Sequence, residues 1–251
     1  MDKNLMTRRF AKSAQSYNQR AEAQLQVARR MIQLLQPYIK KGVGKVVEIG
    51  CGTGLLSRML IDTFVPRKLI MNDISKEMEK HCADILINSN NFFVAIDAEQ
   101  WVLPTGIDLL TSCSTFQWFH QLGGFFEKAF VSLKNDGLFA FSIFGQNNVH
   151  EISSITGKSL HYFTLFELSE MLKKEGFSIL CAKEEKIVLL FDTPKDVLSH
   201  LKQTGVNSIT KQKWTKSTLQ NFSEQYIEHF SCKNGQVSLT YHPMYLICRK
   251  V

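Results

Sequence analysis

Three glycines fall within five residues in the stretch "KVVEIGCGTGLLSRML", which runs from Lys45 to Leu60. A dinucleotide-binding loop has the pattern G-x-G-x-x-G, but Leu55 stands here where the third glycine is required. A phosphate-binding P-loop ends in Gly-Lys-Ser or Gly-Lys-Thr, whereas this loop continues as Gly54-Leu55-Leu56. The glycine spacing therefore argues against both kinds of phosphate site.

The pattern that remains is E-x-G-x-G-x-G, formed by Glu48, Gly50, Gly52 and Gly54. A carboxylate at the end of the preceding strand would repel a pyrophosphate, but it would attract a ligand with a positively charged end. Because glycine lacks a Cβ atom, the backbone of the loop can approach such a ligand closely. The loop thus favours a cationic ligand.

Two more acidic residues end the next two predicted strands, Asp73 after "KLIMN" and Asp97 after "NFFVAI". Asp73 follows the glycines by about 20 residues, the separation at which an acidic side chain can accept hydrogen bonds from both hydroxyls of a ribose. A single aspartate at a strand end is more often a helix cap or a turn residue. Three acids in order at the ends of three successive strands favour a nucleoside site.

This spacing resembles motif I of the class I S-adenosylmethionine (SAM) methyltransferases. The resemblance implies that the glycine loop wraps the methionine part of SAM, that Asp73 binds the ribose, and that Asp97 binds the adenine amino group, with Ala98 contributing its backbone. It also implies a Rossmann-like fold and a reaction that needs no metal. The expected cofactor-binding residues are Glu48, Gly50, Cys51, Gly52, Gly54, Asp73, Ile74, Asp97, Ala98 and Cys113.

The elements around these residues alternate between strands and helices. Apolar residues spaced by three and four predict an amphipathic helix that passes through Tyr17, Leu25 and Ile32 and ends near Pro37. Strands and helices then alternate as far as a strand over 177–191, which predicts a parallel sheet. We expect an α/β, doubly wound, mostly parallel seven-stranded sheet whose last strand, in "SLTYHPMYLICRK", runs antiparallel.

The alternation breaks between residues 193 and 222, a polar, basic stretch with a helical pattern. If the strand before it is parallel to the others, that strand finishes at the carboxyl edge of the sheet, where open α/β sheets bind ligands. We therefore expect one domain over residues 1–251, with an N-terminal helical cover over 1–40 and a helical lid over 193–222. Tyr241 and His242 should then lie above the ligand cleft.

The whole chain is similar to the malonyl-acyl-carrier-protein O-methyltransferases of biotin synthesis. The similarity rests on "FAKSAQSYNQRAEAQLQVA", "EIGCGTG", "FQWFHQL", "FDTPKDVLSHLKQTGVNSI" and "SLTYHPMYLICRK". The most specific of these are the segment containing Leu201, Lys202 and Gly205 and the run Leu239-Thr240-Tyr241-His242. Two residues depart from the family pattern. Cys113 stands where related chains often carry Asn, and Ser199 stands where some carry Arg.

The resemblance implies that SAM donates a methyl group to the free carboxylate of a malonyl thioester on an acyl carrier protein. That carboxylate is already ionised at neutral pH, so no strong general base is needed. Catalysis should then come from holding the reactants in line and from excluding water. The implied catalytic residues are Tyr17, Gln117 and His242, and the implied substrate-binding residues are Trp118, Lys202 and Tyr241.

Several of these side chains have a plainer interpretation. Tyr17 also fits the apolar stripe of the first helix, and Trp118 could be an ordinary core residue. His242 could satisfy a backbone group, and Lys202 could pair with solvent. Three other functions stay open: a SAM methyltransferase with another small-molecule substrate, a SAM-binding protein without catalysis, and a nucleic-acid methyltransferase. The absence of an N-P-P-Y tetrapeptide and of a Pro-Cys pair lowers the last of these.

The composition limits the class of protein. With 251 residues, 44% of them hydrophobic, the chain can form one α/β domain with a sizeable core. The net charge is +7, and residues 1–45 hold ten basic residues against two acidic ones. This basic segment could dock an acidic carrier protein or simply be solvated. The six scattered cysteines suggest neither zinc nor disulfides. We expect a cytoplasmic monomer that binds neither membrane nor nucleic acid.

Overall fold

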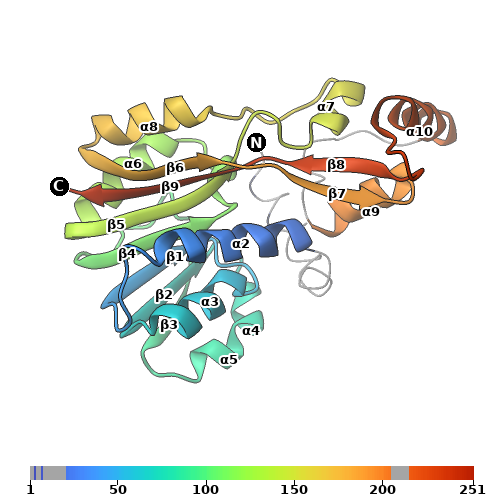
Figure 1. Ribbon diagram of the computed structural model, residues 1–251. Coiled ribbons are helices and arrows are strands. Elements are labelled where there is room, and N and C mark those ends of the chain that lie inside the picture. The colour runs from blue at the N-terminus through green and yellow to red at the C-terminus, as the bar shows by residue number, and fades with distance from the viewer. Residues whose placement is uncertain (1–2, 4–6, 8–20, 205–214) are drawn as a thin grey trace.

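The computed structural model describes Lys3, Thr7, residues 21–204 and residues 215–251. Its centre is a seven-stranded sheet with the strand order β3-β2-β1-β4-β5-β9-β6 (Figure 1). The strands are β1 (Lys45–Ile49), β2 (Lys68–Asp73), β3 (Asn91–Ala95), β4 (Ile107–Cys113), β5 (Leu133–Phe144), β6 (Phe177–Glu184) and β9 (Pro243–Lys250).

Strands β1 to β5 are parallel to one another, and β9 is inserted antiparallel between β5 and β6. Because β9 opposes both of its neighbours, β6 runs parallel to β5. The predicted fold class is therefore confirmed, including the antiparallel last strand.

Helices cover both faces of this sheet because its strands are apolar on both sides. One face carries α2 (Glu22–Leu35) and α3 (Leu55–Phe64), and the other carries α6 (Leu122–Ser132) and α8 (Leu165–Lys174) (Figure 1). Consecutive residues point to opposite faces, so Val46 packs with the first pair and Val47 with the second. Two separate apolar cores result.

Helix α2 lies within the predicted N-terminal cover, residues 1–40. It ends at Leu35, before Pro37, and it packs against the sheet with Ala23, Val27 and Met31 fully buried. Residues 22–35 thus form part of the helical layer on this face of the sheet. Tyr17 lies outside the described residues.

The predicted strand over 177–191 is two strands, and so is the last strand. Beyond Glu184 the chain continues as β7 (Ile187–Phe191), which pairs antiparallel with β8 (Val237–Tyr241) in a separate two-stranded ribbon. The division falls where β5 ends, because the last pair between β5 and β9 is Phe144 with Pro243. Without β5 beside them, β7 and β8 extend past the main sheet (Figure 1).

Among the described residues between β7 and β8, two helices lie in the region predicted as a lid. Helix α9 (Pro194–Gln203) begins after Thr193, whose hydroxyl accepts a hydrogen bond from the backbone of Asp196. Helix α10 (Lys216–Phe230) extends eight residues beyond the predicted limit at 222, and it packs against α9, α7 (His150–Thr156) and β8. Gly205 falls outside the described residues.

Between β2 and β3 the chain forms two short helices, α4 (Met78–His81) and α5 (Ala83–Leu86), which are separated at the buried Cys82. Among the helices of the described ranges, none is both long and apolar enough to cross a membrane.

Candidate active site

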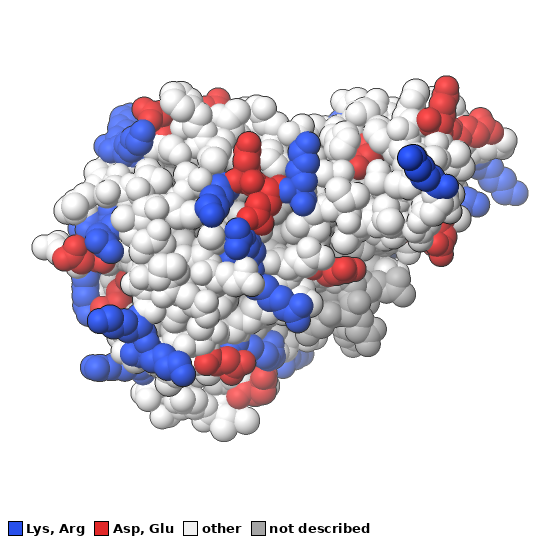
Figure 2. Space-filling model, viewed as in Figure 1, with Lys and Arg blue, Asp and Glu red and all other residues white. Residues whose placement is uncertain are grey.

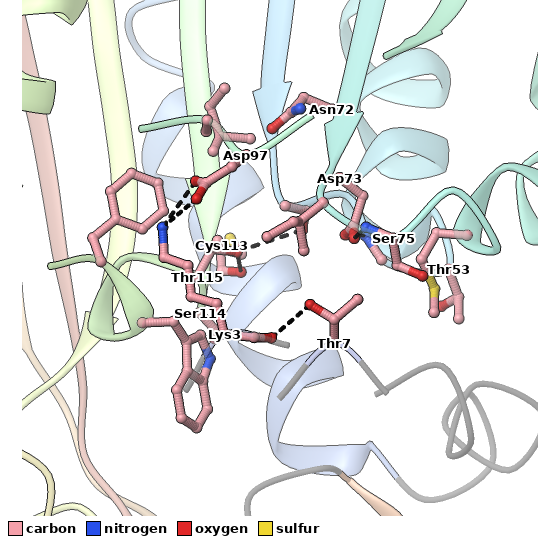
Figure 3. Close-up of a pocket in the computed structure, with 18 residues that line it drawn as sticks. Lys3, Thr7, Thr53, Asn72, Asp73, Ser75, Asp97, Cys113, Ser114 and Thr115 are labelled. Atoms are coloured by element: carbon pink, nitrogen blue, oxygen red, sulfur yellow. Dashed lines mark hydrogen bonds and ion pairs between the residues drawn. The ribbon is translucent and has the colours of Figure 1, made fainter. Parts of the chain in front are cut away.

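A cavity of about 880 Å³, including its open mouth, lies at the carboxyl ends of β1, β2, β3 and β4 (Figure 3). This is the edge at which open α/β sheets bind ligands. Backbone and side chains from four strand ends, together with two residues near the N-terminus, form its wall. The lining residues are Lys3, Thr7, Ile49, Gly50, Gly52, Thr53, Asn72, Asp73, Ile74, Ser75, Met78, Asp97, Ala98, Cys113, Ser114, Thr115, Trp118 and Phe119.

The glycine loop follows β1, and its glycines have different surroundings. A Cβ atom at Gly50 would lie 2.2 Å from the Thr115 hydroxyl oxygen, so the absence of a side chain lets the loop pack against the segment after β4. At Gly52, which has φ +52°, nothing lies within 4 Å of such a Cβ atom. Of these two glycines, only Gly52 lies next to open space, so a ligand can approach the backbone there.

Asp73 ends β2 and holds the glycine loop in place. Its Oδ2 accepts a hydrogen bond from the Gly52 backbone at 3.0 Å, and its Oδ1 accepts one from Ser75 at 2.8 Å. Burial raises the pKa of this carboxyl group, while the backbone donors Ser75, Gly52 and Ile74 oppose that rise. Each carboxylate oxygen has a second lone pair, so Asp73 can still accept hydrogen bonds from a ligand.

Asn72, which the sequence analysis did not single out, also lines the pocket. Its side-chain nitrogen donates to the carbonyl oxygens of Val94 at 3.0 Å and Ile96 at 2.8 Å. Asn72 therefore fixes the chain that leaves β3, immediately before Asp97. An asparagine beside an aspartate at a strand end was the only signal in the sequence.

Asp97 faces the cavity from the end of β3 and is paired with Lys3 (Figure 3). The Lys3 ammonium donates to Asp97 Oδ1 at 2.9 Å and Oδ2 at 2.6 Å, and it also contacts Glu99. Asp97 thus already accepts hydrogen bonds from a nitrogen donor, as it would from an amino group of a ligand. Lys3 could not be found from local sequence spacing because it lies 94 residues from Asp97.

The segment after β4 forms the opposite wall. Cys113, Ser114 and Thr115 line the pocket with Trp118 and Phe119. Burial raises the pKa of the Cys113 thiol to about 12, so it is neutral at physiological pH.

Gln117 belongs to the same segment but does not line the cavity. Its side-chain nitrogen donates to the Ser114 carbonyl at 2.5 Å, and its buried Oε1 has no hydrogen-bond partner among the residues that the structure describes. That oxygen is an available hydrogen-bond acceptor beside the pocket wall formed by the segment after β4.

Glu48 lies beneath the loop and is turned away from the cavity. Its carboxylate accepts a hydrogen bond of 2.5 Å from the Ser57 hydroxyl of α3. Burial raises its pKa to about 7, against the effect of Ser57, and the nearby Asp73 raises it further. The thiols of Cys51 and Cys82 lie 3.8 and 3.7 Å from the Gly52 carbonyl oxygen and so support the loop from below.

Tyr241 and His242 lie at the junction of β8 and β9 rather than in the pocket lining. Tyr241 is fully buried, and its hydroxyl lies 2.9 Å from His200 Nε2 on α9. His242 Nδ1 accepts a hydrogen bond from the Asn147 backbone, and its Nε2 lies 3.4 Å from Glu184. Burial lowers the pKa of His242, although Glu184 opposes this.

The pocket therefore collects most, though not all, of the residues expected to bind the cofactor. Among the expected residues, those in the lining are Gly50, Gly52, Asp73, Ile74, Asp97, Ala98, Cys113 and Trp118. Those outside it are Glu48, Cys51, Gly54, Gln117, Lys202, Tyr241 and His242. Gly54, with φ +79°, instead precedes the first turn of α3.

Together, the strand order, the antiparallel strand and a pocket built on a glycine loop and strand-end acids define a class I methyltransferase fold. Similar solved structures include a phosphoethanolamine N-methyltransferase of Haemonchus contortus in complex with S-adenosyl-L-methionine. Its TM-score is 0.55 at 17% identity, over 88% of this chain and 52% of that chain. The N-methyltransferase NodS of Bradyrhizobium japonicum, in complex with S-adenosyl-L-homocysteine, has a TM-score of 0.52 at 12% identity, over 89% and 85%.

A family model described as a methyltransferase domain matches residues 19–182. A malonyl-[acyl-carrier protein] O-methyltransferase of Bacteroides thetaiotaomicron is 43% identical over 100% of this chain and 99% of its own length. Another, from Haemophilus influenzae, is 35% identical over 99% and 95%. The chain belongs to the malonyl-[acyl-carrier protein] O-methyltransferase family.

Proposed function

We propose that this protein transfers the methyl group of SAM to the free carboxylate of a malonyl group carried on an acyl carrier protein, in biotin synthesis. The observation that carries this proposal is the extent of the similarity. The methyltransferase-domain match ends at residue 182, whereas the relatives match along the whole chain, including β7, α9, α10 and β8. Similarity in the parts outside the cofactor fold supports a shared substrate.

The residues that line the pocket match the chemical groups of SAM. Gly52 leaves open space beside the loop, Asp73 keeps lone pairs for ribose hydroxyls, and Asp97 already accepts hydrogen bonds from the Lys3 ammonium. We assign the methionine part to the loop, the ribose to Asp73 and the adenine amino group to Asp97. When bound, SAM supplies a methyl group activated by the adjacent sulfonium.

The remaining catalytic role of the protein is to position the acceptor carboxylate against the methyl donor. The malonyl carboxylate is ionised at neutral pH, so no side chain has to remove a proton from it. Trp118 and Phe119 supply an apolar wall that excludes water, which strengthens the attraction between an anionic acceptor and a cationic donor. We propose that catalysis rests on this exclusion and on alignment.

The residues on the substrate side of the site belong to the segment after β4, to α9 and to the junction of β8 and β9. Gln117 has a buried side-chain oxygen that accepts no hydrogen bond from the described part of the chain. Lys202 is exposed on α9. We propose that Tyr17, Gln117 and His242 orient the acceptor and that Trp118, Lys202 and Tyr241 contact the substrate, with α9 and α10 as the lid.

The test is a methylation assay with the full chain, SAM and malonyl-acyl-carrier protein, read by mass spectrometry. We expect the malonyl group to gain one methyl group. Acetyl-acyl-carrier protein, which lacks the free carboxylate, is the matched control and should stay unmodified. Binding of SAM without any methylation of the malonyl substrate would contradict the proposed substrate and leave the methyltransferase fold in place.

A further inference from the structure

Lys3 has two anionic partners at the cofactor pocket. Its ammonium lies between Asp97 and Glu99, and it also lies 5.5 Å from the centroid of the Phe119 ring. The side chains of Lys3, Asp97 and Glu99 are 16%, 18% and 11% exposed, so water screens these contacts only weakly. Burial lowers the pKa of Lys3, but the hydrogen bonds to both acids outweigh it and raise that pKa above its ordinary value.

The two partners differ in their position relative to the pocket. Asp97 lines the cavity, whereas Glu99 does not. Glu99 is held from its other side by the backbone of His120 and Gln121, at distances from 2.6 to 3.1 Å. Glu99 is therefore a fixed carboxylate beside the pocket, available to Lys3 whether or not a ligand is bound.

The ammonium occupies the acceptor atoms that an adenine amino group would need. Oδ1 of Asp97 accepts hydrogen bonds from Lys3 and from the Glu99 backbone at 3.0 Å, and Oδ2 accepts one from Lys3. A carboxylate oxygen has two lone pairs, so both pairs of Oδ1 and one pair of Oδ2 are in use, and an adenine amino group would have to share Oδ2 with the ammonium. The Lys3 side chain also forms part of the cavity wall.

We propose that Lys3 competes with the adenine amino group for Asp97 and withdraws onto Glu99 when the cofactor binds. This inference rests on the proposed function, since it takes Asp97 as the adenine-binding carboxylate. Glu99 keeps the displaced ammonium paired, which limits the cost of breaking the contact with Asp97. Lys3 thereby sets the affinity for the cofactor.

The first test compares Lys3→Met with the wild-type protein. Methionine keeps an unbranched chain but removes the ammonium. The readout is the dissociation constant of S-adenosylhomocysteine, measured by calorimetry on the full chain, because this ligand lacks the sulfonium charge. Loss of the competitor should tighten binding by about three- to tenfold, the range of a partly buried ion pair.

Salt provides a second readout on the same two proteins. Added salt weakens ion pairs, so binding to the wild-type protein should tighten as salt increases, and binding to Lys3→Met should change little. Lys3→Arg keeps the cation and is the matched control, with a dissociation constant near that of the wild type.

The variant Glu99→Gln tests whether Lys3 moves onto Glu99 when the cofactor binds. Glutamine can still accept hydrogen bonds from His120 and Gln121, but it removes the second anion and leaves Lys3 more firmly on Asp97. We expect weaker binding in the wild-type background and no change in the Lys3→Met background. At low salt, a dissociation constant for Lys3→Met equal to or higher than the wild-type value would overturn this inference but not the proposed function. Failure of both proteins to bind S-adenosylhomocysteine or SAM would overturn the proposed function as well.

Discussion

Gly50 and Gly52 stand two residues apart, and a methyl group added to each would meet different surroundings. At Gly50 it would lie 2.2 and 2.4 Å from two Thr115 side-chain atoms, and at Gly52 it would enter open space. We predict that Gly50→Ala lowers the free energy of unfolding by about 3 kcal/mol. Gly52→Ala should cost only about 1 kcal/mol for its left-handed backbone, but it should weaken S-adenosylhomocysteine binding at least about tenfold.

Chemical unfolding and calorimetry of the two variants separate these effects. Gly50→Ala serves as the structural control for Gly52→Ala because the loop is the same. Wild-type affinity in Gly52→Ala would mean that the ligand does not approach the loop at this residue.

The buried Glu48 gives a prediction about pH. Its pKa is about 7 in the folded protein and 4.5 in the unfolded chain, so the unfolded chain loses this proton first as pH rises. The free energy of unfolding should therefore fall between pH 4.5 and 7, by about 3 kcal/mol from this group.

Glu48→Gln should remove this fall, since glutamine can still accept the Ser57 hydrogen bond but does not ionise. Between pH 5 and pH 8, denaturant unfolding should show the stability of the variant rising relative to that of the wild type by about 2.5 kcal/mol. A stability difference that is constant across this range would refute the raised pKa.

The sequence identified Asp73 and Asp97 because a carboxylate at the end of a parallel strand has a predictable place. It could not identify Lys3, since no local pattern indicates which distant carboxylate an N-terminal lysine contacts. Glu48 was expected to face the ligand, and the structure turns it to Ser57 instead. Side-chain direction under a loop depends on the packing of α3, which spacing alone does not encode.

At the scale of elements, Asn72 joins β2 to the end of β3. It is 1% exposed and donates to two backbone carbonyls next to Asp97. We predict that Asn72→Ala loosens the chain that carries Asp97 and raises the dissociation constant of S-adenosylhomocysteine about fivefold, with about 1 to 2 kcal/mol lost in stability.

Asn91 offers a matched control at the opposite end of β3, where its side-chain nitrogen donates to the Ile85 carbonyl at 2.9 Å. Asn91→Ala should lose comparable stability without a change in affinity, as measured by the same titration. If both variants bind equally well, Asn72 has only a structural role.

Strand and helix identity followed from the sequence pattern more readily than strand ends did. Short apolar runs bounded by glycine and acids predicted β1 to β5 because buried parallel strands have that composition. The separation of β6 from β7, and of β8 from β9, could not be predicted, since it is set by where the neighbouring β5 ends.

At the scale of the whole molecule, charge bears on the carrier protein. Figure 2 shows Lys and Arg side chains spread over the visible face, with Asp and Glu side chains among them. The net charge is nevertheless +7. We predict that KM for the malonyl carrier protein, which is acidic, rises several-fold between about 50 and 300 mM salt, because salt screens long-range attraction.

Malonyl-pantetheine, which lacks the protein, is the matched substrate, and its KM should stay nearly constant in steady-state assays over the same range. A parallel rise for both substrates would place the salt effect in the active site rather than at a docking surface.

The ribbon of β7 and β8 leaves and rejoins the main sheet at adjacent points. The Glu185 backbone donates to the Pro243 carbonyl at 3.0 Å, so the chain that departs after β6 touches the chain that returns into β9. The two ends of this segment therefore lie side by side, while its α10 and β8 also pack against α7. Exchanging the segment for that of a relative would join the chain at one place on the sheet, but the new segment would have to match the surface of α7.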